Sequence, residues 1–169
     1  GDRMKKTLGM LAFVLLSVSA LAQSTASADP FLTRLAGNWQ GEGMAFGMKA
    51  KVISKWEWTL GQKFLRLDLQ YAMQSKDGKT QTFAGHAYYQ AAGQGKYEGH
   101  WFDSQGNSYP IKATLDGDAL TALWGLPGKS EGKSVYRLSG ADKRFEIQDA
   151  SKQKDGSWRE FSSFKLERE

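Results

Sequence analysis

The sequence has no cysteine, only three prolines and only two histidines among its 169 residues. Without cysteine the chain has no disulfides, no thiolate metal ligands and no cysteine nucleophile. The sequence motifs of serine hydrolases, zinc proteases and dinucleotide-binding folds are also missing. The fold must therefore be stabilised by its hydrophobic core, and a chain of this length can bury enough apolar surface to do so.

The sequence also lacks a strong excess of charge of one sign. The 23 basic and 18 acidic residues give a formal net charge of +5. They are spread along the chain and form no block of like charge. Nucleic-acid binding needs a clustered basic face, so we expect no nucleic-acid partner, and no sequence feature predicts a cofactor.

The longest apolar run is Leu8–Leu21, and it follows the positively charged Met4–Lys6. It ends in a small-x-small sequence at Ala22. The run is shorter than the ~20 residues of a membrane-spanning helix. We interpret residues 1–22 as a Sec-type signal peptide that is cleaved after Ala22.

The rest of the chain is then expected to begin with a flexible lead-in at residues 23–28 and to continue as one domain, residues 29–169. We expect this mature protein to be periplasmic or secreted and to have no membrane span. Its possible partner is a small hydrophobic or amphipathic molecule. Its oligomeric state is not specified by any pattern in the sequence.

Asp29 and Pro30 suit the N-cap and first position of a short helix that ends at Gly37. Beyond it, apolar residues alternate with a period of two, and Gly, Asn or Asp turn signals recur every ~8–12 residues. This pattern predicts an all-β fold, a single antiparallel up-and-down barrel of about ten strands. Such a barrel has no sheet edges, and it can hold packed side chains or one small ligand.

The expected strand at residues 63–73 places five large apolar side chains on one face and Arg66 and Asp68 on the other. If the Arg66 face points inward, Arg66 could pair with a ligand carboxylate. If it points outward, Arg66 belongs to a solvated strand face. Both faces of the predicted strands carry aromatic residues, so the pattern leaves the interior face open.

Both histidines lie in an aromatic-rich central hairpin, and two registers are compatible with its glycines. A turn centred on Gly93 sets His86 directly opposite His100. A two-residue turn at Gln94–Gly95 instead sets His100 opposite Tyr89. The first register also pairs a glycine, Gly85, with Trp101, which favours it. Two histidines are too few for a closed metal site, so no metal is predicted.

Side chains that could line a pocket in this barrel are aromatic, basic or imidazole groups. The candidate ligand-binding residues are Trp56, Trp58, Arg66, His86, Tyr88, His100, Trp101 and Trp124. Non-catalytic binding of a small apolar or amphipathic molecule is the leading hypothesis. The alternatives are a packed barrel that acts through its surface, and an acid–base enzyme on a lipophilic substrate that uses His86 or His100. No catalytic residue is assigned.

The segment Leu35–Gly41, which reads LAGNWQG and follows the short helix, resembles the Gly-x-Trp opening of calycin barrels and of nitrobindin-like barrels. This resemblance implies a calycin-like fold in which Trp39 closes the barrel floor against a basic residue of the last strand, Lys165 or Arg168. Nitrobindin-like barrels bind haem through a histidine near the C-terminus. This chain has no histidine after His100, so haem is not expected.

Three further segments, Gly61–Leu65, Gly95–Gly106 and Thr114–Thr121, resemble a secreted bacterial family called domain of unknown function 1579. The resemblance extends in order from about Phe31 to Glu167. It implies a barrel fold but names no activity.

Overall fold

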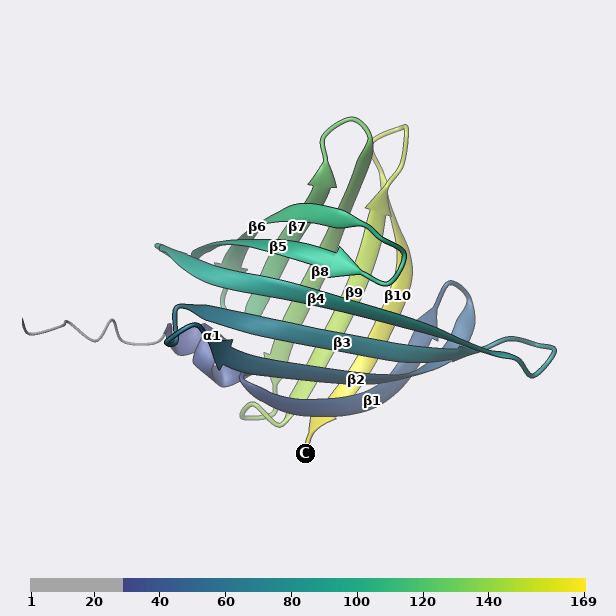
Figure 1. The fold of residues 1–169 in the computed structure, drawn as a ribbon, viewed down its shortest axis with the longest axis horizontal. Coiled ribbons are helices and arrows are strands. Elements are labelled where there is room, and N and C mark those ends of the chain that lie inside the picture. Colours follow the sequence, from purple (N-terminus) through teal and green to yellow (C-terminus); the bar gives the residue numbers. More distant parts are fainter. Residues whose placement is uncertain (1–28) are drawn as a thin grey trace, which may run out of the picture.

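The computed structural model describes residues 29–169. The predicted signal peptide and lead-in, residues 1–28, lie outside the described residues. The described chain forms one short helix and ten strands (Figure 1). Their bounds are α1 Pro30–Leu35, β1 Gly37–Ala45, β2 Met48–Thr59, β3 Phe64–Gln74, β4 Thr80–Gly93, β5 Lys96–Asp103, β6 Ser108–Asp116, β7 Ala119–Leu126, β8 Ser130–Ser139, β9 Arg144–Lys152 and β10 Trp158–Arg168.

The ten strands form a closed antiparallel barrel in which each strand pairs with its neighbours in sequence. The barrel closes where β1 pairs with β10, with Trp39 opposite Arg168 and Ala45 opposite Ser162. In Figure 1 the front strands cross the back strands at a steep angle. The predicted all-β, ten-stranded up-and-down barrel with a short N-terminal helix is confirmed.

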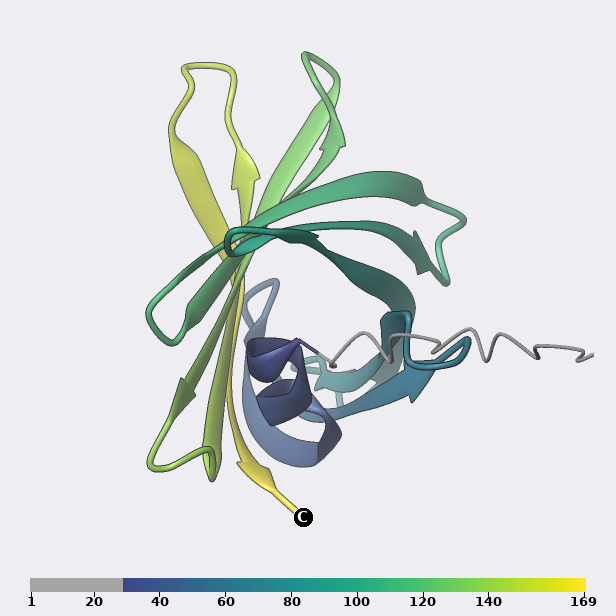
Figure 2. The same cartoon turned by 90° about the vertical axis from the view of Figure 1, so that its left-hand side faces the viewer.

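Helix α1 lies across one end of the barrel (Figure 2). Asp29 is its N-cap, because its carboxylate accepts a hydrogen bond from the backbone N–H of Leu32 at 3.0 Å. The helix buries Phe31, Leu32 and Leu35. Helix α1 therefore closes this end of the barrel with its apolar face.

The interior face of the barrel is the one that carries the leucines of β3. Leu65, Leu67 and Leu69 are buried, whereas Arg66 and Asp68 point outward and pair with polar neighbours. The alternation follows from the pleat, which sends successive side chains to opposite faces. Of the two orientations considered for Arg66, the outward one is correct.

Both predicted registers of the central hairpin are wrong. The turn lies at Gln94–Gly95, where both residues have positive φ, but the register shifts by one residue at a bulge between Ala91 and Gly93. His100 consequently lies opposite Tyr88, and His86 lies opposite Phe102. A bulge adds one unpaired residue to one strand, and alternation of residue types does not mark its position.

Among residues 29–169, no helix is both long and apolar enough to cross a bilayer.

Candidate functional site

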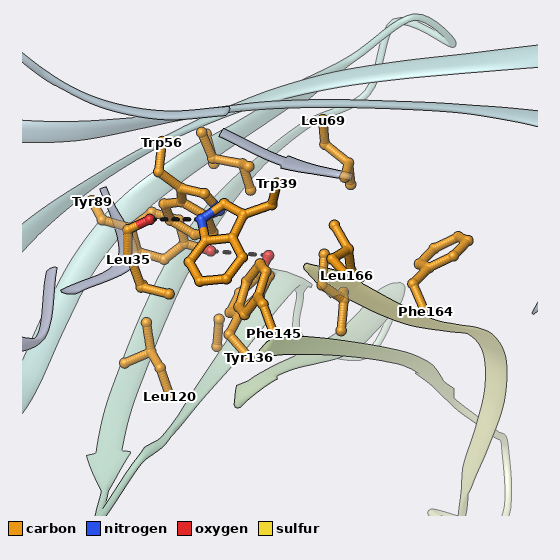
Figure 3. Packing of buried hydrophobic residues seen from close by; sticks show 14 of the residues in the cluster. Leu35, Trp39, Trp56, Leu69, Tyr89, Leu120, Tyr136, Phe145, Phe164 and Leu166 are labelled. Carbon is orange, nitrogen blue, oxygen red and sulfur yellow. Dashed lines mark hydrogen bonds between the residues drawn. The ribbon is translucent and has the colours of Figure 1, made fainter. Parts of the chain in front are cut away.

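The interior of the barrel has two parts with different packing. We call the end next to α1, which contains Trp39, Trp56 and Phe145, the closed half. We call the opposite end, which contains Trp101, Trp124 and Asp149, the open half. The closed half is filled by side chains (Figure 3), and the open half contains a cavity.

Trp39 is the centre of the closed half and is fully buried. Its indole N–H donates to the backbone carbonyl of Leu35 at 2.9 Å (Figure 3). The guanidinium of Arg168 lies 4.1 Å from the centre of the Trp39 ring, a cation–π contact. Arg168 also donates to the carbonyl of Ala36 at 2.7 Å, so it joins the last strand to the end of the helix. Lys165, the other basic candidate, is exposed on the outer face.

Trp56 also belongs to the closed half. Its ring packs against Tyr89, Tyr136 and Phe145, with ring centroids 5.3 to 6.1 Å apart. Trp58, two residues further along β2, is half-buried and packs against the edge of the same core. Neither tryptophan lines the cavity of the open half, so both contribute to packing there.

The cavity in the open half has a volume of about 650 Å³, which is within the ~300–1,000 Å³ typical of small-molecule sites. Its walls are aromatic and its mouth is polar. The mouth is formed by turns at the end opposite α1, which contribute Gly47, Gln105 and Gln153. At this rim the ring of Phe46 stacks on that of Phe161, with centroids 5.0 Å apart.

Two tryptophans lie flat against the cavity wall because a glycine sits beneath each ring. A Cβ added to Gly85 would lie 2.2 Å from the ring of Trp101, and a Cβ added to Gly132 would lie 2.1 Å from the ring of Trp124. Both glycines are thus required by the close approach of an indole. Rings held flat against the wall cover it without filling the cavity.

Each indole N–H of this pair is already hydrogen-bonded to the protein. Trp101 donates to the Asp103 carboxylate and Trp124 donates to the Ser134 hydroxyl, both at 3.1 Å. Burial alone would raise the pKa of Asp103, but hydrogen bonds from Trp101, Asn107 and the backbone lower it below its ordinary value. Asp103 therefore remains ionised and serves to hold the rim of the cavity.

Asp149 is the acidic group inside the open half, and it is 9% exposed. One carboxyl oxygen accepts a hydrogen bond from Ser134 Oγ at 2.6 Å, and the other accepts one from Ser162 Oγ. Burial raises the pKa of Asp149, the two hydroxyls oppose the rise, and Glu160 adds to it. A carboxyl held this way presents an acceptor to the cavity.

Three tyrosine rings complete the wall around Asp149, namely Tyr71, Tyr89 and Tyr136. The hydroxyl of Tyr89 donates to that of Tyr136 at 3.4 Å (Figure 3). Burial raises the pKa of all three phenols, so they are neutral at physiological pH. They offer a ligand aromatic faces and hydroxyl groups without charge.

Four of the candidate residues lie on the outer face and do not line the cavity. Arg66 pairs with Asp68 at 2.8 Å and with Glu57 at 3.3 Å. His86, whose side chain is 57% exposed, is bonded to the same Asp68. The remaining two candidates, Tyr88 and His100, lie opposite each other on the same outer face, and Nε2 of the imidazole is 2.8 Å from Ser108 Oγ.

Of the eight candidate ligand-binding residues, Trp101 and Trp124 line the cavity. Asp149, Ser134 and Tyr136 also line the cavity and were not predicted. One signal for Asp149 was present, because it continues the buried alternation of Phe145 and Ile147 with an acidic residue. Within residues 29–169 no cluster of three or more His, Cys, Asp or Glu side chains has the arrangement of a metal site.

The barrel is similar in fold to known structures. The crystal structure of Rv2717c from M. tuberculosis superimposes with a TM-score of 0.61 at 16% identity, covering 83% of this chain and 98% of that one. A de novo designed fluorescence-activating β-barrel superimposes with a TM-score of 0.42 at 14% identity, covering 82% of this chain and 96% of that design. No family model matches the sequence, and no curated protein matches it.

Proposed function

We propose that this barrel binds one small apolar or amphipathic molecule in its open half, without catalysis. The observation that carries the proposal is the aromatic cavity of about 650 Å³, which Trp101 and Trp124 line. Burial of apolar ligand surface against these rings supplies the free energy of binding, and a few polar groups orient the ligand.

The two alternative functions have less support. A barrel that acts only through its surface needs no interior cavity, and this barrel has one. The acid–base hypothesis needs His86 or His100 beside a bound substrate. Both imidazoles lie on the outer face, away from the cavity. Neither histidine could therefore contact a substrate bound in the cavity.

The proposal is tested first by titration with N-phenyl-1-naphthylamine, a neutral fluorophore that brightens in apolar surroundings. We expect saturable binding with one molecule per barrel. Native mass spectrometry of protein isolated from its own host is the second measurement, and it should detect a co-purifying small molecule. Absence of both signals would refute the binding function.

Two further proposals concern the export of the protein and its family. We propose that the chain is exported, on the strength of the signal-peptide pattern at residues 1–22, and N-terminal sequencing of the host protein should then begin at Gln23. We also propose that it is a calycin-like member of domain of unknown function 1579. The Gly-x-Trp opening and the three segments that resemble this family support the proposal.

A further inference from the structure

We infer that the ligand of this cavity carries a cationic group, such as a primary ammonium, and that this group binds Asp149. The inference rests on the proposed binding function and specifies the chemistry of the ligand.

The charge of the cavity lining is acidic. Among the described residues, the charged groups that line it are Asp103, Asp149, Glu160 and Arg159. The single basic group, Arg159, is exposed and belongs to the mouth, at the beginning of β10. A carboxylate or phosphate head group would therefore meet a like charge at depth, whereas a cation would meet an opposite one.

The hydrogen bonds around Asp149 present its carboxyl oxygens as acceptors. Ser134 Oγ accepts from the indole N–H of Trp124, so its single proton is directed to Asp149. The hydroxyl of Ser162 donates to the other carboxyl oxygen. A carboxylate offers about four lone-pair positions. Two are occupied by these serines, and two remain for donors from a ligand.

Asp103 is different, although it also lines the cavity. It accepts hydrogen bonds from Trp101, from the amide side chain of Asn107 and from two backbone N–H groups. Its lone pairs are occupied within the rim of the cavity. Of these two carboxyls, Asp149 is thus the one with acceptor capacity left for a ligand, and Glu160, the third acidic group of the lining, is exposed at the mouth.

The rings around Asp149 suit a cation as well. Trp124 donates its N–H to Ser134, so its contribution to the cavity is the face of its ring. Tyr71 and Tyr136 add two neutral rings to the lining, each with one face stacked on a further ring, Phe83 or Phe145. The negative face of an aromatic ring attracts a cation, and the attraction is stronger where water is excluded. An ammonium at this position would gain an ion pair and cation–π contacts together.

The test compares two probes of equal chain length, decylamine and decanoate, as competitors of bound N-phenyl-1-naphthylamine at pH 7. On the wild-type protein, half-displacement by decylamine should need about tenfold less ligand than half-displacement by decanoate. Equal potency, or a preference for decanoate, would overturn the inference. If the fluorophore itself does not bind, the proposed binding function fails instead, so the two failures are distinguishable.

The substitution Asp149→Asn keeps the side-chain shape and removes the negative charge. It should reduce the preference for decylamine to about threefold or less while the fluorophore still binds. The matched control is Asp68→Asn on the outer face, which should leave the preference unchanged. A preference that persists in Asp149→Asn would contradict the role of this carboxyl. The wild-type comparison of the two probes stands even if the variant does not fold.

Discussion

The closed and open halves of the barrel are built from the same strands, yet they differ in how they use tryptophan. In the closed half, Trp39 and Trp56 point into the core and fill it. In the open half, Trp101 and Trp124 lie flat on glycines of neighbouring strands. The two tryptophans that lie on glycines thus line the cavity, whereas the two that point inward fill the core, and one fold has a packed end and an open end.

The largest contrast is expected when a tryptophan is removed from each half. Trp39→Ala should lower the free energy of unfolding by about 3–5 kcal/mol, because it leaves a fully buried void and an unstacked Arg168. Trp101→Ala removes a half-buried ring beside an existing cavity and should cost less than about 2 kcal/mol. Urea denaturation measures both. A larger loss for Trp101→Ala than for Trp39→Ala would contradict the division into two halves.

Next in size is the effect of filling the space under a tryptophan of the open half. Gly132→Ala should lower the free energy of unfolding by about 1–3 kcal/mol, because the new Cβ would overlap the ring of Trp124. The displaced ring would enter the cavity and weaken fluorophore binding. Thermal unfolding and fluorophore titration report the two effects.

The matched control is the double variant Gly132→Ala/Trp124→Leu, in which the smaller side chain leaves room for the added Cβ. It should be less destabilised than the sum of the two single variants. If the Gly132→Ala variant has wild-type stability and wild-type fluorophore binding, the glycine is not what holds the ring against the wall.

These glycine–tryptophan pairs also show the limits of sequence analysis for this fold. One of the two predicted registers paired Gly85 with Trp101. In the structure the residue directly opposite Trp101 is Ala87. The ring reaches Gly85 diagonally, across the register that the bulge creates. The position of a bulge depends on the geometry of both strands, so residue types alone did not reveal it.

The barrel could be predicted because the alternation of apolar and polar residues along a strand is a local property of the sequence. The spacing of Leu65, Leu67 and Leu69 in β3 predicts a strand with one buried face. The contact of Trp39 with Arg168 was suggested by the resemblance of its opening segment and involves residues at opposite ends of the barrel domain. Asp149 was missed because its partners Ser134 and Ser162 come from two other strands, which only the closed barrel brings together.

Removing a buried serine hydroxyl should have a smaller effect on the free energy of unfolding, and one of opposite sign in the two halves. Within the described residues, Ser54 Oγ in the closed half is buried and has no hydrogen-bond partner. Ser54→Ala should therefore raise the free energy of unfolding by up to about 1 kcal/mol. Ser162→Ala in the open half should lower it by about 1 kcal/mol, because Asp149 loses a donor. Opposite signs in a urea titration support the assignment, and a loss of stability in Ser54→Ala would contradict it.

The smallest effects concern pH, and here Asp142 in the closed half and Asp149 in the open half have opposite signs. In the closed half, hydrogen bonds from Arg34 lower the pKa of Asp142. The stability from this pair is present above the unfolded pKa of about 3.9 and is lost as pH falls through the lower folded pKa. Arg34→Gln should remove this acid-dependent part. Since Arg34 is 38% exposed, the loss at pH 7 should be no more than about 1 kcal/mol.

In the open half, burial raises the pKa of Asp149. The folded state then holds the proton more tightly than the unfolded state, so stability is highest below about pH 3.9 and falls as pH rises through the folded pKa. Asp149→Asn should abolish this fall, whereas Arg34→Gln should leave it intact. Thermal unfolding midpoints of both variants, measured from pH 3 to pH 8 against wild type, separate the two contributions. If Asp149→Asn follows the wild-type curve throughout, the hydrogen bonds from Ser134 and Ser162 offset the burial of this carboxyl, and its pKa is not raised in the folded barrel.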